Sequence, residues 1–105
     1  MTILEINLIS DQILKVEKRN RFEIYYDILN SLQIQISVRE RVSFTLAASQ
    51  ANLPYNRFQK ALALLIRLGL CNIEGDKFII TEKGEEYLEE YRKINEFFKR
   101  MGFYA

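Results

Sequence analysis

The chain has 105 residues, of which 49% are hydrophobic and 28% charged, which is the composition of one ordinary globular domain and excludes a disordered chain. Its 15 basic and 14 acidic residues give a net charge of +1, so the overall charge points to no particular partner. With no histidine and Cys71 as the single cysteine, the chain lacks the commonest general base and the usual ligands of a zinc site, so we expect no enzyme, no metal and no cofactor.

Residues 1–18 have a pattern that supports two interpretations. Leu4, Ile6 and Leu8 alternate with polar residues as in a strand. A helical spacing is also present, in Ile6, Ile9, Ile13 and Val16. We favour a helix from about Asp11, and we interpret residues 1–18 as an N-terminal extension that takes part in a dimer interface.

A clear helix is predicted from Asn20 to about Leu32. Asn20 and Glu23 stand at the spacing of a capping box, and apolar residues then recur at helical spacing. Ile34, Ile36 and Val38 alternate with polar residues, which predicts a short strand after this helix.

Two further helices are predicted on either side of a tight turn. Ser43 or Thr45 can cap a short helix that runs through Ala51. Residues 52–54 break this helix, since their proline has no backbone N–H. The next helix is expected at residues 55–68, and Gly69 is a natural residue to end it.

Two apolar runs and a long helix complete the chain. Residues 70–73 and 77–80 flank a turn at Gly75-Asp76, which predicts a β-hairpin, and Thr81 can cap a final helix at residues 82–100. Two helices joined by a tight turn and followed by a hairpin indicate a mainly α protein with a small β-hairpin wing (α+β), that is, a winged helix-turn-helix. We assign residues 19–81 to this domain and residues 82–105 to a C-terminal dimerisation helix.

The helix predicted at residues 55–68 carries side chains suited to DNA on one face. On a helical wheel the apolar side consists of Phe58, Ala61, Leu62, Leu65 and Leu68. The opposite side consists of Asn56, Lys60, Ala63 and Arg67, flanked by Arg57 and Gln59. Arginine matches the edge of guanine, and asparagine or glutamine that of adenine, so we expect this helix to enter the major groove. The predicted DNA-contacting residues are Ser43, Thr45, Tyr55, Asn56, Arg57, Gln59, Lys60, Arg67 and Lys77.

The distribution of charge favours the same interpretation. No acidic residue occurs from Val42 to Ile73, whereas this stretch contains Arg57, Lys60 and Arg67. A polyanion would therefore meet a locally cationic surface on a nearly neutral protein. The wing is expected to contribute little affinity, because Glu74 and Asp76 surround its one cation, Lys77.

The chain also resembles a known family. The residues that carry the resemblance are Ala51-Asn52-Leu53 followed by Tyr55, the pair Leu65 and Leu68, and the run from Ile80 to Glu86, which includes Thr81, Lys83 and Gly84. Together they are similar to the archaeal winged-helix regulators, and residues 92–96 look most like the ten-kilodalton archaeal chromatin proteins. The resemblance covers about residues 20–101, and it implies homodimers joined by the last helix and DNA contact through the helix at 55–68. Two features depart from the chromatin proteins, which have a longer C-terminal coil and lack a substantial counterpart of residues 1–18.

The final helix has the pattern of a dimer seam. Its apolar residues recur at heptad spacing: Tyr87, Tyr91, Ile94, Phe98 and Met101, with Leu88 beside them. Acidic residues fill its first half and most basic residues its second half, so an antiparallel pair would place acid against base. The same distribution also complements the dipole of a lone helix, and the apolar stripe could instead pack on the first helix of its own chain.

We therefore expect a cytoplasmic, chromosome-associated protein that binds double-stranded DNA as a homodimer and acts as a transcription regulator or chromosomal protein. The alternative is a winged-helix module that contacts only other proteins, which the acidic wing and low net charge favour. No apolar run reaches the roughly 18–20 residues of a membrane span, and no small-molecule ligand is evident.

Overall fold

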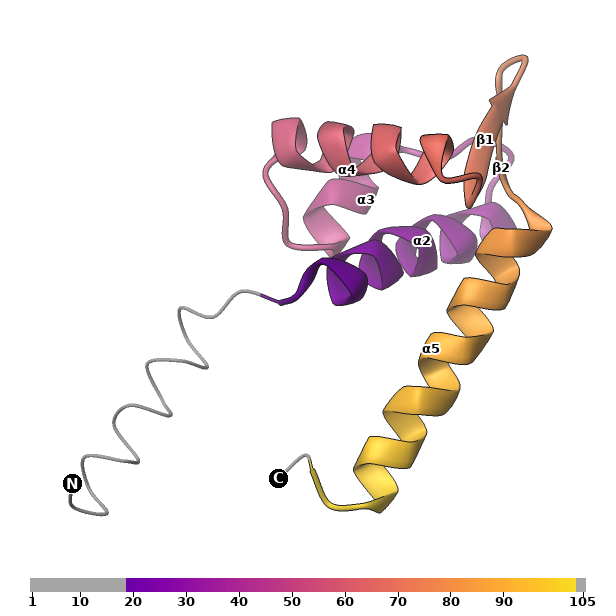
Figure 1. Ribbon diagram of the computed structural model, residues 1–105. Helices are drawn as coiled ribbons and strands as arrows, with labels where there is room; N and C mark the ends of the chain where they lie inside the picture. Colours follow the sequence, from indigo (N-terminus) through magenta and orange to yellow (C-terminus); the bar gives the residue numbers. More distant parts are fainter. Residues whose placement is uncertain (1–18, 104–105) are drawn as a thin grey trace.

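The computed structural model of the chain describes residues 19–103, so the interpretation of residues 1–18 lies outside the described part. The elements in chain order are α2 (Arg21–Val38), α3 (Phe44–Gln50), α4 (Tyr55–Arg67), β1 (Cys71–Glu74), β2 (Lys77–Ile80) and α5 (Glu82–Arg100). This order confirms the predicted winged helix-turn-helix fold. In Figure 1, α2 crosses the middle of the domain, α4 and the hairpin lie above it, and α5 extends away below. No helix within residues 19–103 is long and apolar enough to cross a membrane.

Helix α2 begins where the sequence predicts and extends further than predicted. The side chain of Asn20 accepts a hydrogen bond from the backbone N–H of Glu23 at 2.9 Å, which confirms the predicted cap. The strand predicted at residues 34–38 is wrong, because these residues form the last turns of α2, which ends at Val38.

A buried glutamine explains why the helix continues. The buried residues of α2 follow helical spacing and are Ile28, Leu29, Ser31, Leu32 and Gln35. The side-chain amide of Gln35 donates to the backbone oxygen of Ser43 at 3.0 Å, and its Oε1 accepts from the backbone N–H of Ser43 at 2.6 Å. Ile34, Ile36 and Val38, whose alternation indicated a strand, are all exposed. Helical backbone keeps Gln35 on the buried face, where its amide ties the end of α2 to the start of α3.

The turn between α3 and α4 is held by local hydrogen bonds. Ser43 is the cap of α3, and its hydroxyl oxygen accepts from the backbone N–H of Leu46 at 3.1 Å. After α3, Asn52 has a φ of +56°, a left-handed conformation that asparagine tolerates better than most residues. The backbone N–H of Leu53 then donates to the oxygen of Ala48 at 2.9 Å, which redirects the chain into α4.

A row of aromatic rings joins α3, α4 and the hairpin. Phe58 of α4 is completely buried, and its ring centroid lies 6.0 Å from that of Phe44 in α3. The ring of Phe44 lies 5.8 Å from that of Phe78 in β2, edge to face. Leu62 and Leu65 complete the buried side of α4 as predicted, whereas Leu68 is the C-cap and is 43% exposed, so the wheel placed it wrongly in the core.

Gly69 ends α4 as predicted. Its φ of +82° lies in the left-handed region that glycine adopts without steric cost. The backbone N–H of Leu70 donates to the oxygen of Leu65 at 3.0 Å, and that of Gly69 to the oxygen of Ile66 at 3.0 Å. This pairing is the usual glycine termination of a helix, and it directs the chain into β1.

The hairpin and α5 are joined through the predicted cap, Thr81. Its hydroxyl accepts from the backbone N–H of Gly84 at 3.1 Å and donates to the oxygen of Gly69 at 2.5 Å. The hairpin is antiparallel, and Cys71 pairs with Ile80 in its register. Gly84 lies directly against the backbone between α4 and β1, where a Cβ atom would lie 2.0 Å from the oxygen of Leu70.

One arginine fixes α5 against α2. The Nε of Arg92 donates to the hydroxyl of Tyr26 at 3.1 Å, and its Nη2 donates to Asn30 Oδ1 at 3.0 Å and to Gln33 Oε1 at 2.9 Å. Beside it, the rings of Tyr26 and Tyr91 stack with centroids 4.5 Å apart. The angle at which α5 crosses α2 is therefore set by the hydrogen bonds of the Arg92 guanidinium and by the stacked rings of Tyr26 and Tyr91, in addition to apolar burial.

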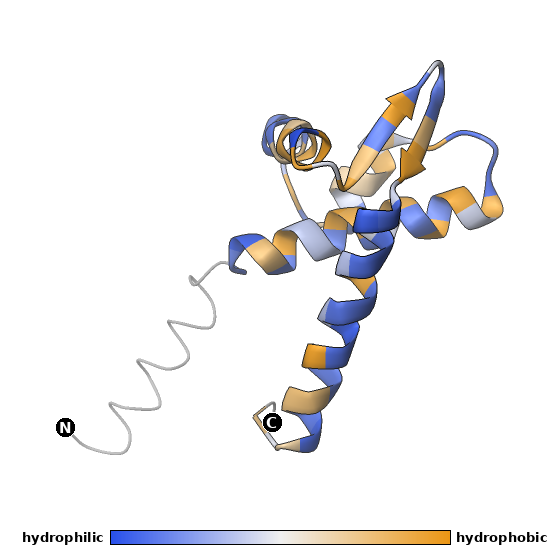
Figure 2. Ribbon diagram, turned by 45° about the vertical axis from the view of Figure 1, so that its right-hand side comes forward, coloured by the Kyte–Doolittle hydropathy of each residue, from blue (hydrophilic) through white to orange (hydrophobic). Residues whose placement is uncertain are grey.

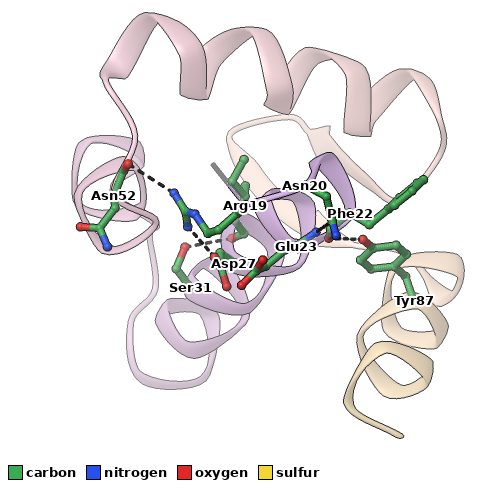
Figure 3. A network of polar contacts seen from close by, with 9 residues as sticks. Arg19, Asn20, Phe22, Glu23, Asp27, Ser31, Asn52 and Tyr87 are labelled. Atoms are coloured by element: carbon green, nitrogen blue, oxygen red, sulfur yellow. Dashed lines mark hydrogen bonds and ion pairs between the residues drawn. The ribbon is translucent and has the colours of Figure 1, made fainter. Parts of the chain in front are cut away.

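Tyr87 makes stability depend on pH in the alkaline range. Its hydroxyl donates to the backbone oxygen of Phe22 (Figure 3), and burial, with smaller contributions from neighbouring acidic groups, raises its pKa from 10.0 to about 12. Because the folded pKa is the higher one, this contribution to stability is fully present below pH 10 and is lost as the pH rises toward 12.

We expect the free energy of unfolding of the wild-type chain to fall more steeply over this pH range than that of a Tyr87→Phe variant. Urea unfolding at several pH values between 10 and 12 measures the difference. Equal slopes for the two proteins would show that Tyr87 does not couple to folding.

Candidate nucleic-acid interface

Helix α4 presents the polar face that the wheel predicts. The exposed residues along it are Tyr55, Asn56, Arg57, Gln59, Lys60, Ala63 and Arg67. Phe58, Leu62 and Leu65 face inward and are buried, so the polar and apolar sides are cleanly separated. Figure 1 shows α4 on the side of the domain opposite to the direction in which α5 extends.

The N-terminal end of α4 is held in place by two local contacts. The ring of Tyr55 stacks on that of buried Phe58, with centroids 6.0 Å apart, and Tyr55 remains 42% exposed. The side chain of Asn56 accepts from the backbone N–H of Arg57 at 2.9 Å. The exposed ring of Tyr55 and the amide of Asn56 therefore lie at the N-terminal end of α4. In DNA-binding proteins of this type, the residues at that end of the helix usually contact base edges.

The cations of α4 make no ion pair with any residue in the described range of 19–103. Neither Arg57, Lys60 nor Arg67 has a carboxylate within salt-bridge distance, in keeping with the acid-free stretch from Val42 to Ile73. The glutamates of α5 are concentrated in its first half, and α5 extends away from the side of the domain that carries α4 (Figure 1). In Figure 2 the hydrophilic colour covers most of α5. Although the net charge is only +1, α4 carries cations and no acid, whereas the first half of α5 is acidic.

The two predicted contacts of α3 differ in what their side chains already do. Ser43 is half-buried, and its oxygen is engaged as the cap of α3. Thr45 lies exposed in the first turn of α3. Of these two residues, only Thr45 has a hydroxyl that is not used to cap the helix.

The wing has a basic neighbour that sequence reasoning missed. Lys77 is exposed at the start of β2 and pairs in register with Glu74. The Nη2 of Arg41, in the loop between α2 and α3, lies 3.7 Å from the carboxylate of Asp76 at the turn, and both side chains are more than 80% exposed. Arg41 offsets one of the two acids that made the wing an unpromising contact. An exposed pair contributes little to stability, so its effect is on local charge.

A shallow cavity of about 460 Å³ lies between this loop and β2, and Arg39, Arg41 and Lys77 are among its lining residues. Figure 2 shows the hairpin between α4 and the loop. Glu40 and Asp76 also line the cavity, so this side of the wing carries charges of both signs, with the cations in slight excess. No local motif identifies Arg39 or Arg41, because they are close to the wing only in the folded chain.

The predicted seam of α5 is narrower than the heptad suggested. Leu88 is completely buried in the core of its own chain, so its assignment to a dimer interface is wrong. Tyr87 and Tyr91 are half-buried against α2, and Phe98 is half-buried further along. Ile94 and Met101 remain free on the surface, at 52% and 55% exposed. Phe97 and Phe103 are also exposed and broaden the strip at this end of the helix.

The chain is similar to known proteins over most of its length. The winged helix-turn-helix family matches residues 18–99, which span α2 through almost all of α5. An uncharacterized protein of Methanocaldococcus jannaschii is 29% identical over 84 residues, which cover 80% of this chain and 78% of that protein. The family match therefore includes α4, the hairpin and almost all of the long final helix.

Proposed function

Because the chain belongs to the winged helix-turn-helix family, we propose that it binds double-stranded DNA as a homodimer, with α4 in the major groove. The observation that carries the proposal is the exposed face of α4, which has three cations, two amides and no acid. Such a face offers donors to both phosphates and base edges. We place the protein on the chromosome in the cytoplasm, as a transcription regulator or chromosomal protein without catalytic activity.

The residues of this surface have different expected roles. Asn56, Arg57 and Gln59 stand near the N-terminal end of α4 and are proposed to contact bases, because their side chains match base edges. Lys60 and Arg67 lie further along the helix and are proposed to contact phosphates. The exposed ring of Tyr55 and the hydroxyls of Ser43 and Thr45 are proposed to contact the backbone beside α4. Lys77 and the newly identified Arg41 are proposed to contact phosphates next to the wing.

The first experiment is binding of the purified protein to random double-stranded DNA across a salt series, with its mass measured in solution. Several phosphate contacts per dimer predict a slope of log affinity against log salt of about −4 to −6. A dimer that does not bind at low salt would contradict general DNA binding and would direct the search to a protein partner.

Replacing Arg57 by alanine is expected to relax sequence specificity. A bidentate contact to one base is worth about 1–3 kcal/mol of discrimination. Selection of binding sites from random DNA would therefore yield a more degenerate consensus for Arg57→Ala than for wild type. A Lys60→Ala variant is the matched control, since loss of a phosphate contact weakens binding to all sequences about equally. An unchanged consensus for Arg57→Ala would remove it from base readout.

The homodimer is proposed to form through the exposed strip of α5. Ile94, Phe97 and Met101 supply its apolar centre, and Tyr91 and Phe98 border it. The acidic first half of α5 and the cations Lys99 and Arg100 favour an antiparallel pair. Arg92 contributes less to this polarity than its position suggests, because it is already bound to α2.

An antiparallel pair makes a distinct prediction for crosslinking. With Cys71 replaced by alanine, a chain that carries Lys93→Cys and Arg100→Cys, two exposed positions that flank Phe97, should form disulfides between position 93 of one subunit and position 100 of the other. Peptide mapping after mild oxidation identifies the linked positions. Links that join only like positions would show parallel helices.

A second candidate is a winged-helix module that binds proteins only. The exposed Ile34 and Val38, which lie one helical turn apart at the end of α2, favour it, since they form an apolar pair apart from α4. Its binding to a partner would be nearly insensitive to salt, whereas DNA binding weakens steeply.

A further inference from the structure

A groove lies between the N-terminal half of α2 and α5, and both helices contribute to its lining. Figure 1 shows how α5 extends away from α2 on this side of the domain. It has a volume of about 930 Å³, and its apolar lining consists mainly of Phe22, Tyr26, Tyr87, Tyr91, Ile94 and Phe98. Phe22 is 58% exposed and Ile94 52% exposed, so the lining is open to solvent within the described residues. Exposed apolar surface that is continuous over two helices marks a binding surface.

We propose that residues 3–16 of the same chain fill this groove. The N-terminal extension is attached at the rim of the groove, because Asn20 and Phe22 both line it. Arg19 fixes that attachment, since its guanidinium lies 2.5 Å from the carboxylate of Asp27 and donates to the backbone oxygen of Asn52 at 3.3 Å (Figure 3). The extension therefore starts beside the surface that it is proposed to cover.

The extension has the apolar side chains and the length that the groove requires. Ile6, Ile9, Ile13 and Val16 recur at helical spacing. As a helix, the stretch from Ile6 to Val16 would span about 15 Å, and the groove wall from Tyr87 to Phe98 on α5 spans about 16 Å. The few residues between Val16 and Asn20 are left to turn the chain into the groove.

The charges of the two surfaces are also complementary. At the attached end the groove lining has four acids, Glu23, Asp27, Glu86 and Glu90, against one cation, Lys83. Lys15 and Lys18 would approach these acids, and Glu17 lies between the two lysines in the sequence. At the far end, Glu5 would approach Lys99. This polarity holds when the extension runs back along the groove from its attachment, and it fails when the extension lies in the reverse direction.

Tethering favours the extension over a second copy of the chain. A segment joined by a short linker has an effective concentration in the millimolar range at its site, which a separate molecule must exceed. The seated extension would cover Ile94, together with Tyr91 and Phe98 at the border of the proposed dimer strip, and would leave Phe97 and Met101 exposed. The contact between subunits would then be formed by Phe97, Met101 and the outer side of the extension, and the groove would be filled within each subunit.

A single tryptophan tests this arrangement. The chain contains no tryptophan, so a Phe22→Trp variant carries one reporter in the groove, on α2 and apart from the strip of α5. Acrylamide quenching of its fluorescence is measured in the full chain and after adding Ile9→Asp and Ile13→Asp. We expect the quenching constant to rise at least about twofold, because a covered ring returns to open solvent. Adding Asn7→Asp and Gln12→Asp is the matched control, which introduces two charges but removes no apolar side chain.

Other outcomes would overturn the proposal. Equal quenching in all variants would mean that the extension does not cover Phe22. Shielding that disappears on dilution and ignores the aspartates would identify a second copy as the occupant. Thermal unfolding of each variant verifies that the domain is folded, and DNA affinity measured in parallel is a separate readout of α4, so failure of one proposal leaves the other testable.

Discussion

Replacing Arg57, Lys60 and Arg67 together by glutamine is expected to reduce the salt dependence of DNA binding strongly. A homodimer loses the four proposed phosphate contacts of Lys60 and Arg67, and each contributes about 0.9 to the slope of log affinity against log salt. The slope should therefore become shallower by about 3 to 4, leaving the part that Arg41 and Lys77 supply, and affinity in low salt should fall by about a thousandfold or more, because the base contacts of Arg57 are lost as well. Glutamine keeps the length and polarity of the side chains, and all three positions are exposed, so the fold should be unaffected.

A matched pair of single variants separates α4 from net charge. Arg21 of α2 is exposed and lies outside α4, the α5 strip and the groove lining, so its replacement by glutamine should leave the DNA affinity nearly unchanged, whereas Lys60→Gln should lower it. Equal losses for Arg21→Gln and Lys60→Gln would indicate that binding follows net charge alone, and α4 would no longer be the reading element.

Replacing Gly84 by alanine is expected to disrupt the join between α5 and the hairpin. In an open helix this change would stabilise the chain by about 0.5–1 kcal/mol, because alanine is the better helix former. Here the added Cβ would lie 2.0 Å from the oxygen of Leu70 and 2.7 Å from Cγ2 of Ile80. Since the first contact is with backbone, no rotamer change relieves it. We expect a net loss of roughly 3 kcal/mol or more.

Urea unfolding measures this loss, and Gly102→Ala is the control. A Cβ at Gly102 meets no atom within 4 Å, so only the cost of a left-handed backbone, about 1–2 kcal/mol, is expected there. A Gly84→Ala protein as stable as wild type would show that α5 can shift away from the hairpin without loss.

The features that were predictable from sequence depend on local chemistry. Asn20, Ser43 and Thr81 cap their helices because the hydrogen bonds involve residues three positions away, and Gly69 ends α4 through its own backbone conformation. The polar face of α4 was also predictable, because helical periodicity alone separates it from Phe58 and its neighbours.

The features that were missed depend on contacts between distant segments. The alternation from Ile34 to Val38 fits a strand, and only the bonds from Gln35 to Ser43 decide for a helix. The pairing of Arg41 with Asp76 and the burial of Leu88 likewise arise when the hairpin and α5 pack against α2. No periodicity in the sequence contains this information.

The fork of Arg92 has a consequence for how a dimer would measure DNA. Because Arg92 holds α5 at a set angle to α2, two subunits joined through α5 would carry their α4 helices at one fixed separation. Major grooves on the same side of a duplex recur every helical turn, about 34 Å. The dimer would therefore bind two half-sites tightly at one spacing only, and inserting a few base pairs between them would lower its affinity. The operator would in this way be selected by the distance between its half-sites as well as by its sequence.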